Sequence, residues 1–307
     1  MGIVVIGATF VDIKGFPEDA YVPTGRNVGR VEYVHGGVAR NVVEDIANVE
    51  LRPTFLGIVD DTPLGTDVLQ KLKKHKVNVE HVLTIPDGMG TWLAVFDNNG
   101  DVAGSISKRP NMLPIVKLLE EKGDEIFRTA DSVVLEVDLD KEIVKTVLDL
   151  AERYQTKVFG LVSNMSIAAK RRDFLQKFHC FICNQQEAGL LFLDDYSNTT
   201  PQQLQDILGE KVMRAGIPSM VVTMGERGAV YADYRGDKGI CPARNVQVKD
   251  TTGAGDAFCA GVAIGLTYGK NLREAIEIGS QLAASVITSS ENVCPRFRPE
   301  EFGLHIK

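Results

Sequence analysis

The chain has 307 residues, of which 44% are hydrophobic and 24% are charged, and its formal net charge is −7 at pH 7. These values are typical of one large or two small globular domains, and they exclude a chain that is disordered throughout. The acidic balance argues against nucleic acid or an anionic membrane surface as the main partner, although a few backbone amides can still bind a small anion.

The predicted elements alternate between strands and helices along the whole chain. In the first predicted helix, Ala39, Val42 and Ile46 lie on one face because they follow the helical period. Repeated βα units predict a mostly parallel sheet with helices on both faces. The predicted strands are 3–6, 54–59, 77–83, 133–135, 158–161, 178–183 and 220–223. The predicted helices are 36–50, 64–75, 141–153, 167–177, 202–215, 253–268 and 272–287.

Two stretches, 10–35 and 88–107, interrupt this alternation. The first is rich in glycine, proline and charge and has no helical period. The second is typical of a β-hairpin, because alternating residues flank a turn at Asn98, Asn99 and Gly100. We expect both insertions to form a small β-strand lid on a single α/β domain that spans 1–307.

The sequence contains no segment that predicts a membrane span or a signal peptide. The longest runs without charge, 257–269 and 278–290, are shorter than the roughly 18 residues that a spanning helix needs. Met1 is followed at once by an apolar run, without a basic region. The five cysteines, an odd number, are most simply reduced thiols. We therefore expect a cytoplasmic protein.

The strongest chemical signal lies at 250–258, where Gly253, Ala254 and Gly255 precede Asp256 at the start of a predicted helix. Glycines let the backbone turn tightly, and the unpaired amides of a helix N-terminus attract an anion. A carboxylate in the same turn, that of Asp256, can face both a bound phosphate and an attacking nucleophile. The alternative is an ordinary capped helix, but the preceding Asp-Thr-Thr and the small residues of the helix favour a functional site.

This motif resembles the second signature of the ribokinase-like (PfkB) carbohydrate and nucleoside kinases. Their first signature, a diglycine with an asparagine five residues after the first glycine, is similar to Gly36, Gly37 and Asn41. An Asn-x-x-Glu motif at 184–187 and a nucleotide loop at 223–228 follow in the family's order. The resemblance covers essentially the whole chain. It implies a ribokinase-like three-layer α/β/α fold with a mostly parallel sheet and a small β lid.

The resemblance implies an ATP-dependent kinase with Asp256 as catalytic base. Asp256 would accept the proton of a substrate hydroxymethyl group as its oxygen attacks the γ-phosphate, in a reaction that depends on positioning and charge stabilisation. The amides of Gly253, Ala254 and Gly255 would form an anion hole for the charge that develops.

The resemblance also assigns metal and nucleotide residues. Glu187, with Asn184, would organise Mg²⁺ largely through water. Asp250 and the carbonyl of Thr252 stand where relatives often bind a monovalent cation such as K⁺, although a K⁺ requirement is not predicted. The segment 283–287 would flank the adenine. The residues expected along the ATP phosphates are Thr223, Gly225 and Gly228.

Asp12 stands where the family uses a carboxylate to bind substrate hydroxyls. At the diglycine formed by Gly36 and Gly37, the amide of Gly37 would bind another hydroxyl, and so would the side chain of Asn41. Phe10 departs from the family pattern, because many relatives have asparagine at this position. The departure indicates a more apolar substrate surface.

Local features of the chain resemble the pseudouridine kinases within this family. They lie at 37–41, 136–139, 162–163 and 290–295. We therefore expect phosphorylation of the 5′-hydroxyl of pseudouridine or a similar nucleoside. Kinases of ribose, fructose or 2-keto-3-deoxygluconate remain alternatives.

Two interpretations that assign the chain to other functional classes also remain open. One is a ligand-binding regulator that has kept the fold and lost catalysis. The other is a redox enzyme that uses Cys180 and Cys183, but their apolar strand pattern favours core packing. Because an exposed β edge favours pairing, we also expect a homodimer through the lid.

Overall fold

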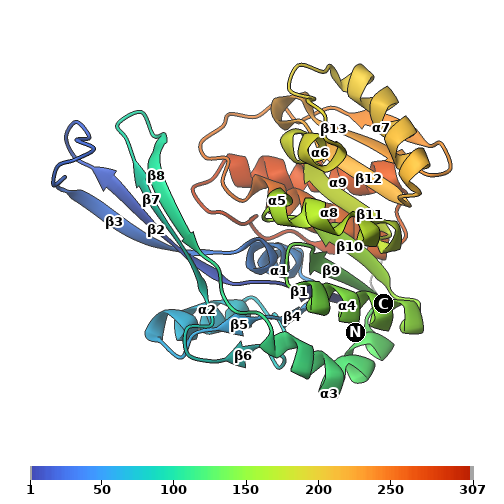
Figure 1. The fold of residues 1–307 in the computed structure, drawn as a ribbon, viewed down its shortest axis with the longest axis horizontal. Coiled ribbons are helices and arrows are strands. Elements are labelled where there is room, and N and C mark those ends of the chain that lie inside the picture. Colours follow the sequence, from blue (N-terminus) through green and yellow to red (C-terminus); the bar gives the residue numbers. More distant parts are fainter. Residues whose placement is uncertain (1, 305–307) are drawn as a thin grey trace.

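An eight-stranded sheet forms the centre of the computed structural model, which describes residues 2–304 (Figure 1). Its order is β14-β13-β12-β11-β10-β9-β1-β4, and the strands from β12 to β4 run parallel. The prediction of a mostly parallel sheet is therefore confirmed. The parallel strands are β1 (Ile3–Ile6), β4 (Thr54–Leu56), β9 (Ser132–Glu136), β10 (Lys157–Leu161), β11 (Cys180–Asn184) and β12 (Ser219–Thr223). The antiparallel edge strands are β13 (Ala229–Asp233) and β14 (Lys238–Cys241).

Helices cover both faces of this sheet, which gives the predicted α/β/α layers. Alternate strand residues point to opposite faces, so each face has its own apolar core. The helices of one face are α1 (Val38–Asn48), α2 (Pro63–Lys74), α8 (Ala254–Thr267) and α9 (Leu272–Ile287). Those of the other are α3 (Pro114–Thr129), α4 (Lys141–Tyr154), α5 (Met165–Ala168), α6 (Gln185–Phe192) and α7 (Pro201–Ala215). No helix in residues 2–304 combines the length and apolar character needed to cross a bilayer.

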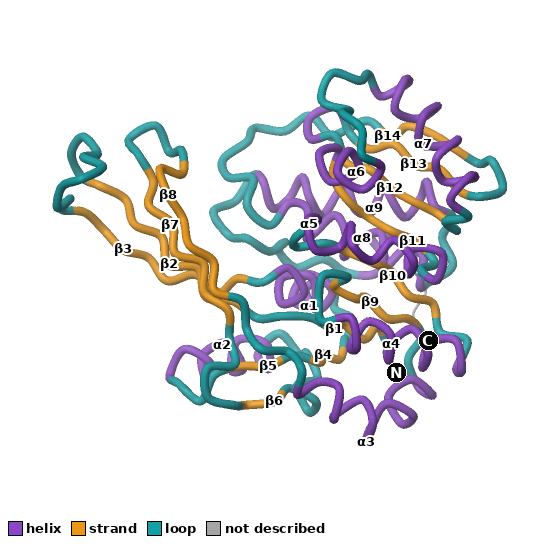
Figure 2. Tube along the Cα trace, viewed as in Figure 1, coloured by secondary structure: helices purple, strands orange, loops and turns teal. Residues whose placement is uncertain are grey.

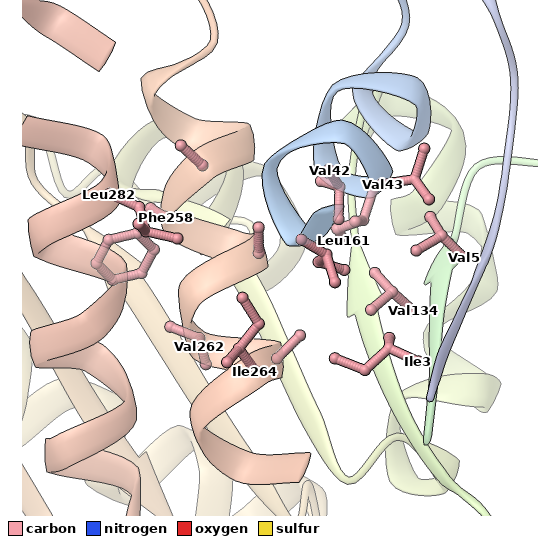
Figure 3. Close-up of a cluster of buried hydrophobic side chains, with 14 of the residues drawn as sticks. Ile3, Val5, Val42, Val43, Val134, Leu161, Phe258, Val262, Ile264 and Leu282 are labelled. Carbon is pink, nitrogen blue, oxygen red and sulfur yellow. The ribbon is translucent and has the colours of Figure 1, made fainter. Parts of the chain in front are cut away.

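The core between α1, α8 and the sheet fixes the start of α8. Figure 3 shows Val42 and Val43 of α1 beside the sheet, with Val262 and Ile264 of α8 next to them. Small residues bring α9 close to α8: a Cβ atom at Gly261 would lie 2.5 Å from the Cα atom of Gly279. Such close packing leaves no room for a larger side chain.

A second sheet, ordered β3-β2-β7-β8, projects from this body as a separate arm (Figures 1 and 2). The hairpin predicted at 88–107 is confirmed, since β7 and β8 pair antiparallel and Gly100 in the turn has a φ of 85°. We call this sheet the lid. Its strands are β2 (Phe10–Pro17), β3 (Gly29–Gly36), β7 (Gly90–Phe96) and β8 (Val102–Lys108).

Three predicted elements differ in the structure. The strand predicted at 54–59 is interrupted at Gly57, after which β5 (Ile58–Val59) leaves the central sheet to pair with β6 (Leu83–Thr84). The strand predicted at 77–83 is wrong before Leu83, because the amide of Val82 turns back to the carbonyl of Val79.

The helix predicted at 167–177 is α-helical only to Ala168 and continues as a 3₁₀-helix over Ala169–Lys177. In the 3₁₀ segment, Phe174 and Leu175 are the buried residues among those whose side chains are described, so the segment has no apolar stripe of α-helical period. The prediction also missed α3, α6, β13 and β14.

A buried ion pair joins two residues of α1 that lie one helical turn apart. The side chains of Arg40 and Glu44 are 1% and 0% exposed and bond to each other, and Arg40 also donates to the carbonyl of His35 at 2.5 Å. Burial would raise the pKa of Glu44, but Arg40 and Lys71 outweigh it and lower that pKa. The pair therefore stays ionised and ties α1 to the end of β3.

The substitution Glu44→Gln is expected to lower the free energy of unfolding by about 3 kcal/mol, because it leaves the buried Arg40 guanidinium without a counter-charge. Urea denaturation at pH 7.5 measures this loss. Glu120→Gln on exposed α3 surface is the control, with an expected change below about 0.5 kcal/mol. A loss of less than about 1 kcal/mol for Glu44→Gln would contradict the assignment.

Candidate active site

The N-terminus of α8 is shaped by a glycine that no other residue can replace without strain. Gly253 has a φ of 81°, and a Cβ atom there would lie 2.0 Å from the carbonyl oxygen of Asn292. The amide of Ala254 donates to the carbonyl of Thr251 at 3.2 Å. Within residues 2–304, the amides of Gly253, Gly255 and Asp256 donate no hydrogen bond. These amides are therefore open to an anion at the positive end of the helix.

Asp256 lies in this first turn and is held by a residue of α1. Its Oδ2 accepts a hydrogen bond from Nδ2 of Asn41 at 2.7 Å. Nδ2 of Asn292 in turn donates to Oδ1 of Asn41 at 3.3 Å and to the carbonyl of His35 at 2.8 Å. The two signature motifs, which lie far apart in the sequence, thus meet at one carboxylate.

The pKa of Asp256 is raised to about 6, chiefly because the carboxyl group is buried. Its hydrogen bond from Asn41 and the charge of Arg40 oppose this rise, and the carboxylates of Asp12 and Glu187 add to it. A carboxyl group with such a pKa is mostly ionised at neutral pH and can accept a proton there.

Asp12 and the diglycine lie beside this carboxylate at the base of the lid. A Cβ atom at Gly36 would lie 2.6 Å from Oδ1 of Asp12, so the glycine makes room for the carboxylate. Gly37 has a φ of 97°, and a Cβ atom there would lie 2.6 Å from the carbonyl oxygen of Ala8. Burial raises the pKa of Asp12, and Lys14 opposes that rise. The expected substrate residues Asp12, Gly36, Gly37 and Asn41 are therefore brought together.

A cavity of about 840 Å³ leads away from the open amides between β12, α8 and α9. Its volume suits a nucleotide. Gly228 has a φ of 88°, and a Cβ atom there would lie 2.1 Å from the carbonyl oxygen of Cys241, so the loop also depends on glycine. The cavity is lined by the expected residues Thr223, Gly225, Gly228, Ala254, Gly255, Ala283, Ala284 and Ile287.

Asn184 and Glu187 lie instead along a neighbouring cavity of about 570 Å³. Oδ1 of Asn184 accepts from the Glu187 amide at 2.9 Å, and Oε2 of Glu187 accepts from the Asn184 amide at 2.7 Å. Burial raises the pKa of Glu187, and Asp138 adds to the rise. No group of three or more His, Cys, Asp or Glu in the described residues could hold a metal ion. A single carboxylate fits a Mg²⁺ ion that is bound mainly by phosphate and water.

Asp250 and Thr252 form the turn before α8. Oδ1 of Asp250 accepts from the amide of Thr252 at 2.8 Å. Burial would raise the pKa of Asp250, but the hydrogen bonds from Thr252 and the charge of Lys14 lower it. The carboxylate is therefore ionised, as a cation ligand must be.

Cys180 and Cys183 are free, buried thiols in β11. Burial raises the pKa of Cys180 to about 12 and also raises that of Cys183. A thiol that stays protonated is a poor nucleophile, so a redox role for this pair loses its support.

Residues at the ends of β9 and β10 also reach the site, although no role was predicted for them. Oε2 of Glu136 accepts from the amide of Ala8 at 2.8 Å, and burial raises the pKa of Glu136 to about 8, to which Asp138 adds. Asp138 bonds to Arg109 and Ser163. In the sequence, segments 136–139 and 162–163 resembled the pseudouridine kinases but indicated no role for these residues, and nothing in the pattern pointed to Arg109.

Comparison with known proteins places this chain in one family. The profile of the pfkB family carbohydrate kinases matches residues 2–294. The chain is 38% identical over 299 residues to guanosine-inosine kinase of Exiguobacterium acetylicum, which covers 94% of this chain and 95% of that protein. It is 25% identical to pseudouridine kinase of Escherichia coli over 94% and 91% of the two chains. The structure of Arabidopsis thaliana ribokinase with ribose and ATP matches with a TM-score of 0.84 at 19% identity, over 98% and 97% of the chains.

The substitution Asp256→Asn is expected to stabilise the fold at pH 7.5, because asparagine can still accept the bond from Asn41 but carries no buried charge. A pKa of about 6 instead of an ordinary aspartate value corresponds to a gain of at most roughly 3 kcal/mol in the free energy of unfolding. The gain should be smallest at pH 4, because it vanishes only well below the ordinary aspartate pKa of 3.8, where Asp256 is protonated in both states. It should grow up to about pH 6 and then stay constant.

Urea denaturation of both proteins between pH 4 and pH 8 measures this gain. Asp250→Asn is the matched control with the opposite expected sign, because the pKa of Asp250 is lowered by the fold. An Asp256→Asn protein that is less stable than wild type at pH 7.5 would contradict the buried-charge argument.

Proposed function

This chain belongs to the pfkB family of carbohydrate kinases and is an ATP-dependent phosphotransferase, and we propose that it phosphorylates the 5′-hydroxyl of 6-oxopurine nucleosides such as guanosine and inosine. The observation that carries this proposal is the 38% identity to a guanosine-inosine kinase along nearly the full length of both chains. Pseudouridine, the substrate expected from the sequence, stays an alternative, since the identity to that kinase is 25%.

The chemistry we assign to Asp256 follows from its contacts. The substrate 5′-oxygen attacks the γ-phosphorus, the bond from this phosphorus to the bridging oxygen of ADP breaks, and the hydroxyl proton passes to Asp256. Asn41 holds the carboxylate in place through its hydrogen bond. Asp12 and the amide of Gly37 would bind the other hydroxyls of the ribose.

Charge on the transferring group would be stabilised by the N-terminus of α8. Ala254 and Gly255 line the nucleotide cavity, and the open amides of Gly253 and Gly255 belong to the same turn. Mg²⁺ would neutralise phosphate charge when bound, with Glu187 and Asn184 holding its water shell. Asp250 and Thr252 would hold a monovalent cation such as K⁺ beside the same turn.

We propose that residues 1–307 act as one kinase domain whose lid closes over the substrate. The lid joins the body next to Asp12 and the diglycine, so its closure would shield the γ-phosphate from water. The five free cysteines fit a reducing compartment, and we propose the cytoplasm.

The outer face of the lid supports the proposal of a homodimer. One apolar row crosses all four strands in register, formed by Tyr33, Ile13, Leu93 and Ile106. Tyr33 and Ile106 are 61% and 70% exposed. Because this uncharged row runs from edge to edge of the lid, we propose that a second copy of the chain covers it with the same row.

Guanosine and inosine are expected to give the highest kcat/KM when ATP consumption is measured with Mg²⁺. The panel adds adenosine, pseudouridine, ribose, fructose and 2-keto-3-deoxygluconate. Asp256→Asn should lower kcat by roughly 10²- to 10⁴-fold, because it removes the base. Asp149→Asn on exposed α4 surface is the control.

A preference for pseudouridine or a free sugar would contradict the proposed 6-oxopurine nucleoside acceptor. The phosphotransferase activity would stand. ATP binding without turnover of any acceptor in the panel would favour a regulator that has lost catalysis.

Ile106→Asp is expected to yield a monomer at micromolar concentration while wild type is a dimer, because it places a charge in the proposed interface. Sedimentation equilibrium measures the masses. The control is Ser105→Asp, which lies next to Ile106 on the opposite face of the same strand. A monomeric wild type would remove the dimer.

A further inference from the structure

The substrate-facing side of the lid base carries an aromatic ring next to Asp12. Phe10 and Asp12 share one face of β2, and a Cβ atom at Gly90 would lie 2.4 Å from the Phe10 ring. The ring therefore lies across Gly90 of the neighbouring strand. Asp12 adds its carboxylate to the electrostatic surroundings of Asp256, so this face looks toward the proposed base.

A guanidinium group continues this surface. Thr91 pairs with Lys108, the last residue of β8, and Arg109 follows directly after this pair. Arg109 also acts electrostatically on Glu136, which bonds to the Gly7–Ala8 turn under the diglycine. The surface that a bound nucleoside would meet beside the ribose site thus has an aromatic ring and a cation.

Arg109 is held from one side only. Its Nη2 donates to the carboxylate of Asp138 at 2.9 Å and to the carbonyl of Asp138 at 3.0 Å. Asp138 is fixed in turn, because its Oδ1 accepts from the amide of Ser163 at 2.9 Å and its Oδ2 from the Ser163 hydroxyl at 3.1 Å. This chain of bonds orients the guanidinium plane before any substrate arrives.

The other edge of Arg109 remains available to a ligand. Its side chain is 37% exposed, while that of Asp138 is 0% exposed. Nε and Nη1 donate no hydrogen bond to any residue in the described range 2–304. An arginine has only donors, so these N–H groups can donate to the acceptors of a ligand.

We propose that Arg109 is a specificity-determining residue that recognises the O6 and N7 acceptors of a 6-oxopurine base, while Phe10 stacks on the base. This inference rests on the proposed function. Guanine and hypoxanthine both present O6 and N7 side by side, the acceptor pair that arginine recognises.

Other bases do not offer this pair. Adenine presents an N6 amino donor beside N7, which would face the N–H groups of Arg109. The uracil base of pseudouridine has no second acceptor next to O4, because a ring N–H flanks it on one side and the ribosyl carbon on the other. Arg109 would therefore select 6-oxopurines against both.

The experiment compares guanosine with 7-deazaguanosine, in which a C–H group replaces N7. For wild type, kcat/KM is expected to be about tenfold or more lower for 7-deazaguanosine. In Arg109→Met the value for guanosine should fall to that for 7-deazaguanosine, so that their ratio is within about twofold. The preference for guanosine over adenosine should fall in the same variant.

Two further variants make the result decisive. Arg109→Lys keeps a cation beside Asp138 but loses the planar guanidinium, so its ratio of kcat/KM for guanosine to that for 7-deazaguanosine should also fall below about threefold. This variant tests the inference even if Arg109→Met does not fold. Arg153→Met removes an exposed arginine that pairs with Asp124 and should keep the wild-type ratio.

Each outcome has a separate meaning. If the Arg109 variants phosphorylate guanosine and keep the wild-type ratio of kcat/KM for guanosine to that for 7-deazaguanosine, this inference alone is overturned. A wild type that does not distinguish 7-deazaguanosine from guanosine also overturns it. A wild type that phosphorylates neither guanosine nor inosine overturns the proposed function together with the inference.

Discussion

One hydrogen bond, from Asn41 to Asp256, joins the two halves of the site, and its geometry depends on how α1 packs against α8. Each helix starts at a glycine with positive φ, Gly37 and Gly253, where a Cβ atom would strike a backbone carbonyl. The apolar core beneath, which includes Val42 and Val262, fixes the distance between the helices (Figure 3). The alignment of the carboxylate with the open amides is therefore a result of core packing.

The site is also a place where the fold tolerates buried charge. Burial raises the pKa of three carboxyl groups, those of Asp45 in α1, Glu136 at the end of β9 and Asp256 in the first turn of α8. The chain near its end stabilises part of this arrangement, since the amide of Cys294 donates to Asp45 at 2.6 Å. Such groups reduce stability, and proteins retain them where proton transfer or ligand binding requires them.

The lid has two chemically different faces. The face toward α8 carries Asp12 and Trp92, and the opposite face carries the exposed row that includes Tyr33 and Ile106. Period-2 alternation in the strands produces this division. The lid forms a sheet separate from the central sheet and projects from the body as an arm (Figure 2).

The sequence by itself determined the α/β/α architecture, the hairpin of the lid and the family, because glycine turns, apolar periodicity and short motifs act locally. It could not place the strand expected at 77–83 or the helix expected at 167–177, since turn hydrogen bonds and the lack of an apolar stripe decided those segments. Only the tertiary structure brought Asn41 to Asp256 and Arg109 to Asp138. These contacts join residues far apart in the chain, and a pattern along one chain holds no information on which distant side chains the packing of the sheet will bring together.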